Sequence, residues 1–139
     1  MEPFTRRPTK TTPYVHLDAM KGIFVLSGRS IPIDAEVFYR PILAKIDELS
    51  LESPEKIEFC FRFDFFNIAS SKRILFILYK LADLQKSGTQ VLVRWMYERF
   101  DEDMLEIGQD YNLMIDEVNF LFEEYDSLEN KKKAAVKLS

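Results

Sequence analysis

One nine-residue run, from Ile57 to Phe65, constrains the fold more than any other part of this chain. Its apolar residues alternate with more polar ones: Glu58, Cys60, Arg62 and Asp64. A period of two is that of a β-strand, whose successive side chains point to opposite faces. A strand covered on both faces would be apolar throughout. The run therefore predicts a sheet with one face only partly covered and with its helices mainly on the other face.

The segments that follow this strand complete a βαβ unit. Residues 70–86 are apolar almost all round and predict a deeply packed helix, with Gly88 as its stop signal. Residues 90–98 alternate again and predict a strand, which places Trp95 on the same face as two valines. A strand, a helix and a second strand in this order predict two parallel strands joined by a right-handed crossover.

Turn and cap residues set the boundaries of the remaining elements. Gly22 suits the turn between two short strands, and Gly28 is predicted to end the second of them. Asp34 is the predicted N-cap of a helix that Pro41 should kink. The remaining predicted elements are strands at 14–18 and 23–27, a helix from Asp34 to about Leu49, a helix at 102–115 and a strand at 118–125.

Together these elements predict an α/β fold in a single small domain, with a mixed sheet of four to five strands. A chain of 139 residues has the length of one domain. We expect an extended N-terminal arm at 1–12, the α/β domain at 13–126 and a charged tail at 127–139.

Charge and hydropathy exclude several classes of partner. The net charge of −4 argues against nucleic acid as the main partner, because neutralising phosphates needs a basic surface. No window approaches the ~20 apolar residues that a membrane span requires, and the first residues lack the apolar core of a secretion signal. The sequence thus predicts a cytoplasmic protein that contacts neither nucleic acid nor membrane.

The sequence contains no recognisable catalytic or metal-binding motif. One cysteine, Cys60, and one histidine, His16, are too few for a zinc site. The chain has no Gly-rich phosphate loop and no nucleophile elbow. The acidic run from Asp101 to Asp103 is explained by the helix dipole, although a partner-contacting face or a metal site are alternatives. We therefore predict a protein without enzymatic activity, metal or cofactor.

Residues 66–72 join the predicted central strand to the buried helix. In open α/β sheets, ligands and modifications gather at this edge. The N–H groups of a helix start also favour anions. A serine in this segment is therefore either a helix cap or a phosphorylation site.

Several short motifs recur in a fixed order along the chain. They are Thr12-Pro13, Gly28-Arg29-Ser30-Ile31-Pro32, Phe38-Tyr39-Arg40-Pro41, Phe66-Asn67 with Ser70-Ser71-Lys72, Arg94-Trp95-Met96-Tyr97 and Asp101-Glu102-Asp103-Met104. In this order and spacing, the chain resembles the SiaC family of bacterial regulatory phosphoproteins over nearly all of residues 12–120.

The resemblance implies a fold like that of STAS domains and a regulatory role without catalysis. Proteins of this family bind and activate a diguanylate cyclase when they are unphosphorylated. A Ser/Thr kinase and a PPM-type phosphatase set the phosphorylation state. The expected output is cyclic di-GMP signalling and biofilm or surface behaviour. A phosphorylation-independent scaffold on the same fold is the alternative, and a small-molecule binder or an enzyme that uses the acidic helix is a third hypothesis.

The chain departs from the family pattern at the expected phosphoacceptor. The family has Thr-Ser-Ser after the asparagine, whereas Ile68 and Ala69 stand at the first two of these positions here. Either the acceptor is Ser70, with Ser71 as the second choice, or the modification has been lost. Ser70 is preferred because it keeps the family's register at the strand–helix junction, where helix N–H groups stabilise an anion.

The partner is expected to contact the strand–helix junction and the strand beside it. Trp95 shares a strand face with two valines, which favours a place in the core over a place in an interface. The candidate partner-binding residues are Asn67, Ile68, Lys72, Arg94, Trp95, Tyr97, Asp101 and Asp103.

Overall fold

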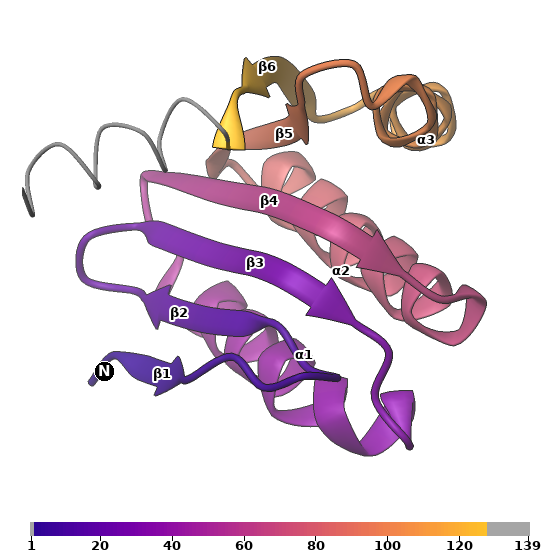
Figure 1. Cartoon of the computed structure of the whole chain (residues 1–139). Helices are drawn as coiled ribbons and strands as arrows, with labels where there is room; N and C mark the ends of the chain where they lie inside the picture. The colour runs from indigo at the N-terminus through magenta and orange to yellow at the C-terminus, as the bar shows by residue number, and fades with distance from the viewer. Residues whose placement is uncertain (1, 128–139) are drawn as a thin grey trace, which may run out of the picture.

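The computed structural model describes residues 2–127, and these form one mixed sheet and three helices (Figure 1). In chain order the elements are β1 (Phe4–Arg6), β2 (Tyr14–Asp18), β3 (Ile23–Ser30), α1 (Ala35–Glu52), β4 (Lys56–Phe66), α2 (Ile68–Lys86), β5 (Gln90–Glu98), α3 (Glu102–Met114) and β6 (Asn119–Tyr125).

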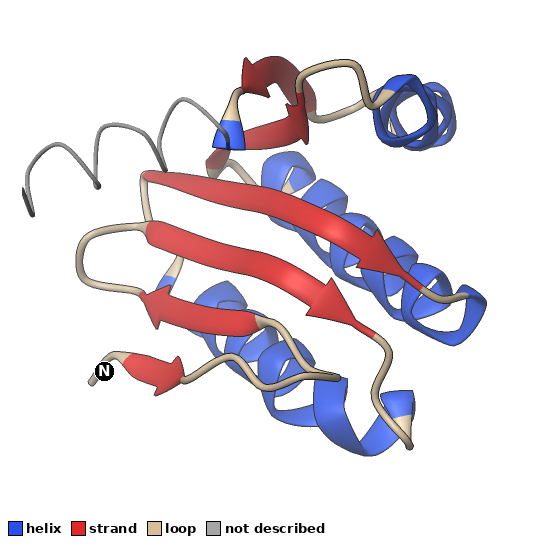
Figure 2. Ribbon diagram, in the orientation of Figure 1, coloured by secondary structure: helices blue, strands red, loops and turns tan. Residues whose placement is uncertain are grey.

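The six strands lie in the sheet in the order of the chain (Figure 2). β1, β2 and β3 are antiparallel neighbours, and β3 to β6 run parallel. The predicted α/β domain with a mixed sheet is confirmed, as are the parallel strands of the βαβ unit. The strand number is corrected to six, because part of the predicted arm pairs with β2 as β1. From residue 128 on, the predicted charged tail lies outside the described residues.

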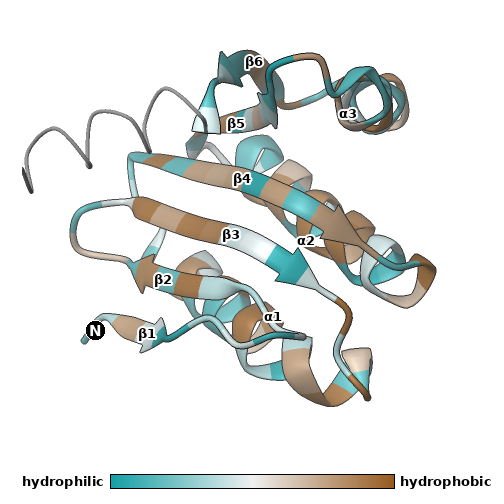
Figure 3. Cartoon of the chain, viewed as in Figure 1, coloured by the Kyte–Doolittle hydropathy of each residue, from teal (hydrophilic) through white to brown (hydrophobic). Residues whose placement is uncertain are grey.

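The core fills only one side of the sheet. On β4, Phe59, Phe61 and Phe63 are at most 1% exposed, and their alternation with polar residues appears as bands in Figure 3. Helices α1 and α2 lie behind the sheet in Figure 1. Helix α3 packs on Trp95, whose ring centroid is 5.5 Å from that of Phe61 on this same side. Helices on one face of the sheet are therefore confirmed.

Among residues 2–127, no helix combines the length and the hydropathy needed to cross a membrane.

A β-bulge interrupts the alternation near the end of β4. Gly28 pairs with Phe63, but Arg29 pairs with Phe65, so Asp64 is an extra residue without a partner on β3. The bulge turns Phe65 away from the core, where we had expected it, and leaves it 51% exposed. Gly28 does not end β3 as predicted, because its φ of +109° is accessible to glycine and lets the strand continue to Ser30. Phe66 takes the inward position, with its ring 5.2 Å from that of Phe63.

Helix α3 approaches β5 closely because Gly108 has no side chain. A Cβ atom at this position would lie 2.4 Å from Nε1 of the Trp95 ring. The ring itself is fully buried, and its Nε1–H donates to the carbonyl oxygen of Met104 at 2.9 Å. Tyr111 packs edge-on against it at 5.6 Å. This contact holds α3 at its distance from the sheet.

We predict that Gly108→Ala destabilises the protein although alanine is the better helix former. The added methyl group overpacks the Trp95 contact at a cost of about 1–3 kcal/mol, which exceeds the gain of about 1 kcal/mol in helix propensity. Urea unfolding measures the difference in the free energy of unfolding. The control is Gln109→Ala at the exposed neighbouring position. An unchanged or raised stability of Gly108→Ala would show that α3 is free to move away from β5.

Candidate partner-binding surface

Helix α2 begins directly after β4, two residues earlier than predicted. Asn67 is its N-cap, with its side-chain oxygen accepting a hydrogen bond from the backbone N–H of Ser70 at 2.9 Å. The backbone N–H of Asn67 donates to the carbonyl oxygen of Ser30 at 3.1 Å. These bonds fix the junction between β3, β4 and α2, and they place Ser70 inside the first helical turn.

The Ser70 hydroxyl is buried in a polar network beneath α2. It donates to the carbonyl oxygen of Ser30 at 3.0 Å and lies 2.9 Å from the Ser30 hydroxyl. That hydroxyl is in turn 2.6 Å from the Tyr39 hydroxyl of α1. Ser70 has no exposed surface, and burial raises the pKa of Tyr39 to about 12. The three hydroxyl groups join α1, β3 and α2, and they leave Ser70 inaccessible to another protein in this conformation.

Ser71 and Lys72 lie closer to solvent than Ser70. The Ser71 hydroxyl, on a half-buried residue, donates to the carbonyl oxygen of Ile68 at 2.6 Å. Its own carbonyl oxygen accepts from the Tyr111 hydroxyl at 2.8 Å, which ties α2 to α3. Lys72 is exposed, with its Nζ 5.8 Å from the centroid of the Phe76 ring. A hydroxyl and a cation therefore lie together on the outer side of the first turn.

Apolar side chains face solvent at the carboxyl ends of the parallel strands. Phe65 is 51% exposed, Ile68 is 89% exposed and Phe100 is 82% exposed. Ile33, between β3 and α1, is fully exposed at the same edge. We call these four residues the apolar edge. Large apolar side chains exposed at one edge of the sheet make this edge a candidate interaction site.

Phe100 takes part in the apolar edge through a strained backbone. Its φ of +71° lies in the left-handed region, which a bulky residue rarely adopts. The strain turns the ring outward in the β5–α3 connection, and the guanidinium of Arg99 lies 4.8 Å from the ring centroid. Sequence reasoning missed Phe100 because no motif marks it, and it missed Phe65 because the bulge is not visible in the alternation.

The predicted candidates on β5 and α3 separate into different environments. Trp95 is fully buried and belongs to the core, so it is withdrawn as a partner-binding residue. The side chain of Asp101 is engaged as the N-cap of α3, accepting from the Met104 N–H at 3.0 Å. Half-buried Tyr97 lines a hollow of about 210 Å³ together with Asp101 and Phe100. Asp103 is exposed in the first turn of α3.

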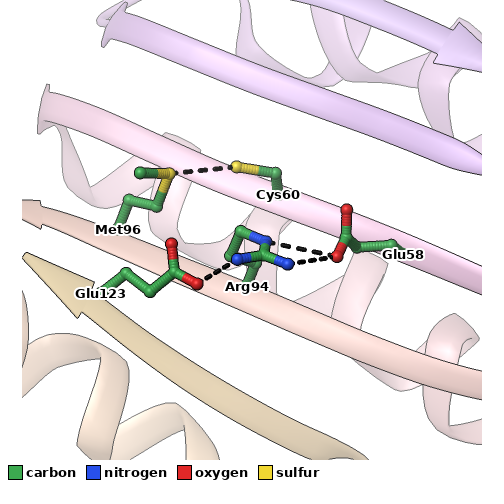
Figure 4. Close-up of polar contacts among 5 residues, drawn as sticks. All are labelled: Glu58, Cys60, Arg94, Met96 and Glu123. Atoms are coloured by element: carbon green, nitrogen blue, oxygen red, sulfur yellow. Dashed lines mark hydrogen bonds and ion pairs between the residues drawn. The ribbon is translucent and has the colours of Figure 1, made fainter.

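Arg94 lies on the open face of the sheet rather than at the apolar edge (Figure 4). Its Nη2 and Nε bond Glu58 Oε1 at 2.6 Å and 3.2 Å, and Nη1 contacts Glu123. The hydrogen bonds to Glu58 raise the pKa of the guanidinium further above its ordinary value. These bonds link β4, β5 and β6 across the open face, so Arg94 has a structural explanation that needs no partner.

Cys60 lies beside this network and shows no sign of reactivity. Its thiol contacts the Met96 sulfur at 3.5 Å, and burial raises its pKa to about 11. A thiol with so high a pKa is protonated at neutral pH and is a poor nucleophile. Among residues 2–127, no group of three or more His, Cys, Asp and Glu side chains has an arrangement suited to a metal ion.

We predict that Phe100→Gly does not destabilise the protein, because the ring makes little buried contact and glycine adopts the positive φ freely. The free energy of unfolding should stay the same or rise by up to about 1 kcal/mol. Urea unfolding measures it, with Phe66→Gly as the control that removes a packed ring. A loss of more than about 1 kcal/mol in Phe100→Gly would show that the ring stabilises the fold.

Comparisons with known proteins identify the family of the chain. The model of the SiaC family of regulatory phosphoproteins matches residues 6–125. The chain is also similar to a chain in the crystal structure of the diguanylate cyclase SiaD in complex with its activator SiaC, from Pseudomonas aeruginosa. The TM-score is 0.83 and the sequence identity is 20%, and the match covers 88% of this chain and 99% of that chain.

Two further comparisons agree with this match. Apo-SiaC of the same organism has a TM-score of 0.81 and 20% identity, with 88% of this chain and 99% of that chain covered. An uncharacterized protein of Pseudomonas aeruginosa strain UCBPP-PA14 is 23% identical over 103 residues, which is 74% of this chain and 82% of that protein. The family model matches nearly all of the described residues, and the solved SiaC structures have the same fold. This chain therefore belongs to the SiaC family of regulatory phosphoproteins.

Proposed function

We propose that this chain binds a diguanylate cyclase through the apolar edge and activates it, without catalysing a reaction itself. The observation that carries the proposal is the exposure of Phe65, Ile68 and Phe100, which lie at or just after the carboxyl ends of the strands β4 and β5. The structural likeness to SiaC, which was crystallised with a diguanylate cyclase as its activator, supports the choice of partner. The proposal keeps the cytoplasmic location and the cyclic di-GMP and biofilm output expected from the resemblance.

The chemistry of the apolar edge suits a protein partner. Interfaces draw most of their binding energy from a few aromatic and large apolar side chains that lose their contact with water. Three such side chains are already exposed here, and the strained backbone at Phe100 holds one of them in place before binding. Lys72 and Asp103 provide charged groups at the rim, where they would influence the association rate and the specificity.

We predict that Ile68→Ala weakens binding to the cyclase by about tenfold or more, as truncation of a central interface residue does. The matched control is Leu51→Ala, an equally exposed apolar residue near the end of α1, remote from the junction. Calorimetry with the SiaD-like cyclase of the source organism gives the dissociation constants, and production of cyclic di-GMP gives the activation. Equal effects of the two substitutions would move the interface away from the apolar edge.

Regulation by phosphorylation is a separate part of the proposal. We infer that Ser71 is a better acceptor than Ser70, which reverses the order predicted from the sequence. The Ser70 hydroxyl is buried, and a phosphate there would displace the bonds to Ser30 and force a charge into the protein interior. A phosphate on Ser71 would lie near Lys72 and next to Ile68, where about −1.5 to −2 charges would oppose apolar contact with a partner.

We predict that a cognate Ser/Thr kinase phosphorylates Ser71 and that a PPM-type phosphatase reverses the reaction. Intact-mass analysis should show one phosphate on the wild-type chain and on Ser70→Ala, and none on Ser71→Ala. Phosphate mapped to Ser70 or to a threonine of the N-terminal arm would contradict this placement. The absence of any phosphate would favour the alternative in which Ile68 marks a lost switch and the chain is a phosphorylation-independent scaffold.

A further inference from the structure

A cleft of about 390 Å³ lies between the N-terminal strand β1 and the first turns of α1. Its walls are mainly apolar and include Phe4 from β1 and Val37, Phe38 and Pro41 from α1. The cleft exists because β1 is an edge strand of only three residues, which leaves the layer between sheet and helix uncovered there. Its volume falls in the range of sites that bind small molecules.

Two arginines line the cleft without an acidic partner among the described residues. Arg6 and Arg7 both belong to the lining, and neither forms an ion pair with any of residues 2–127. The guanidinium of Arg6 lies 5.0 Å from the centroid of the Phe4 ring, another residue of the cleft wall. In a chain whose net charge is −4, this corner therefore offers uncompensated positive charge next to an apolar surface.

Hydrogen bonds fix the loop that closes one side of the cleft. The hydroxyl groups of Thr9 and Thr12, both in the lining, are 2.6 Å apart, and the Thr9 hydroxyl also accepts from the Thr12 N–H at 2.9 Å. The neighbouring Thr11 carbonyl oxygen accepts from the Ile31 N–H at 2.8 Å, which ties the loop to the end of β3. The cleft is thus formed before any ligand arrives, as ligand sites usually are.

We propose that this cleft binds a small organic anion with an apolar body. Arg6 and Arg7 bind the anionic group by charge-assisted hydrogen bonds, and the body packs on Phe4 and Phe38. The cleft shares no residue with the apolar edge, so such a ligand acts at a site of its own. A regulatory protein of this family would then read a small molecule as well as its protein partner.

The test uses the full chain and the fluorescent dye 8-anilinonaphthalene-1-sulfonate, which combines an aromatic body with one negative charge. We expect one saturable site, with dye-induced NMR shifts at residues 4–12 and 37–42. Arg6→Gln with Arg7→Gln should weaken dye binding by about tenfold or more, because hydrogen bonds to charged groups are lost. The matched control, Lys10→Gln with Lys21→Gln, removes the same charge from exposed residues outside the lining and should leave binding unchanged.

Two further measurements keep the result interpretable. Val37→Trp fills the cleft from an exposed position without removing a charge and should also abolish binding. Octanoate should displace the dye, whereas inorganic phosphate at the same concentration should not, because it has no apolar body. Absence of dye binding, equal affinity of the arginine variant and its control, shifts centred elsewhere, or displacement by phosphate would each overturn the proposal. Ile68→Ala should bind the dye normally, so failure of the proposed cyclase interface leaves this test unaffected.

Discussion

The hydrophobic core of residues 2–127 lies on one side of the sheet, and the other features of the molecule depend on that constraint. Each step from β3 to β6 moves to the next strand in the same direction through a helix. Right-handed crossovers in one direction place every helix on the same face. Helices therefore cover the inward side chains Phe59, Phe61 and Phe63 of β4, and the opposite face of the sheet must be stable in contact with water. The charged network around Arg94 meets this requirement by linking three strands.

The same topology brings the candidate interface together. Helices α1, α2 and α3 each begin after the carboxyl end of a parallel strand, so their first turns share one edge of the sheet. The bulge at Asp64 and the positive φ of Phe100 then turn two aromatic rings outward at that edge. Both features interrupt the regular backbone and leave apolar rings in water. The proposed partner would cover both rings.

The sequence predicted the elements better than it predicted the surface. The alternation of side chains placed the strands β4 and β5 correctly, and the N-cap residue Asp34 placed the start of α1, because these signals are local. The Asp34 side chain accepts a hydrogen bond from the Val37 N–H, as an N-cap does. The three-residue strand β1 was read as an arm, because pairing with β2 depends on a contact that no local pattern encodes.

The candidate site was predicted in part. Asn67 and Ile68 lie at the strand–helix junction as expected, but the N-cap is Asn67 and not a serine of this segment, as had been considered. Trp95 was correctly weighed as a core residue, but the burial of Ser70 was not foreseen, since it depends on Ser30, forty positions away in the sequence. Phe65 and Phe100 were missed because a bulge and a left-handed residue depend on packing between strands.

Hydrogen–deuterium exchange of the full chain, with and without the SiaD-like cyclase, tests most directly whether the apolar edge is the interface. The account predicts that the cyclase slows amide exchange in residues 65–72 and 99–104, at the starts of α2 and α3, and leaves the amides of residues 56–61 in β4 and 90–95 in β5 unchanged. Slower exchange confined to these strand residues around Arg94, with the helix starts unaffected, would contradict it.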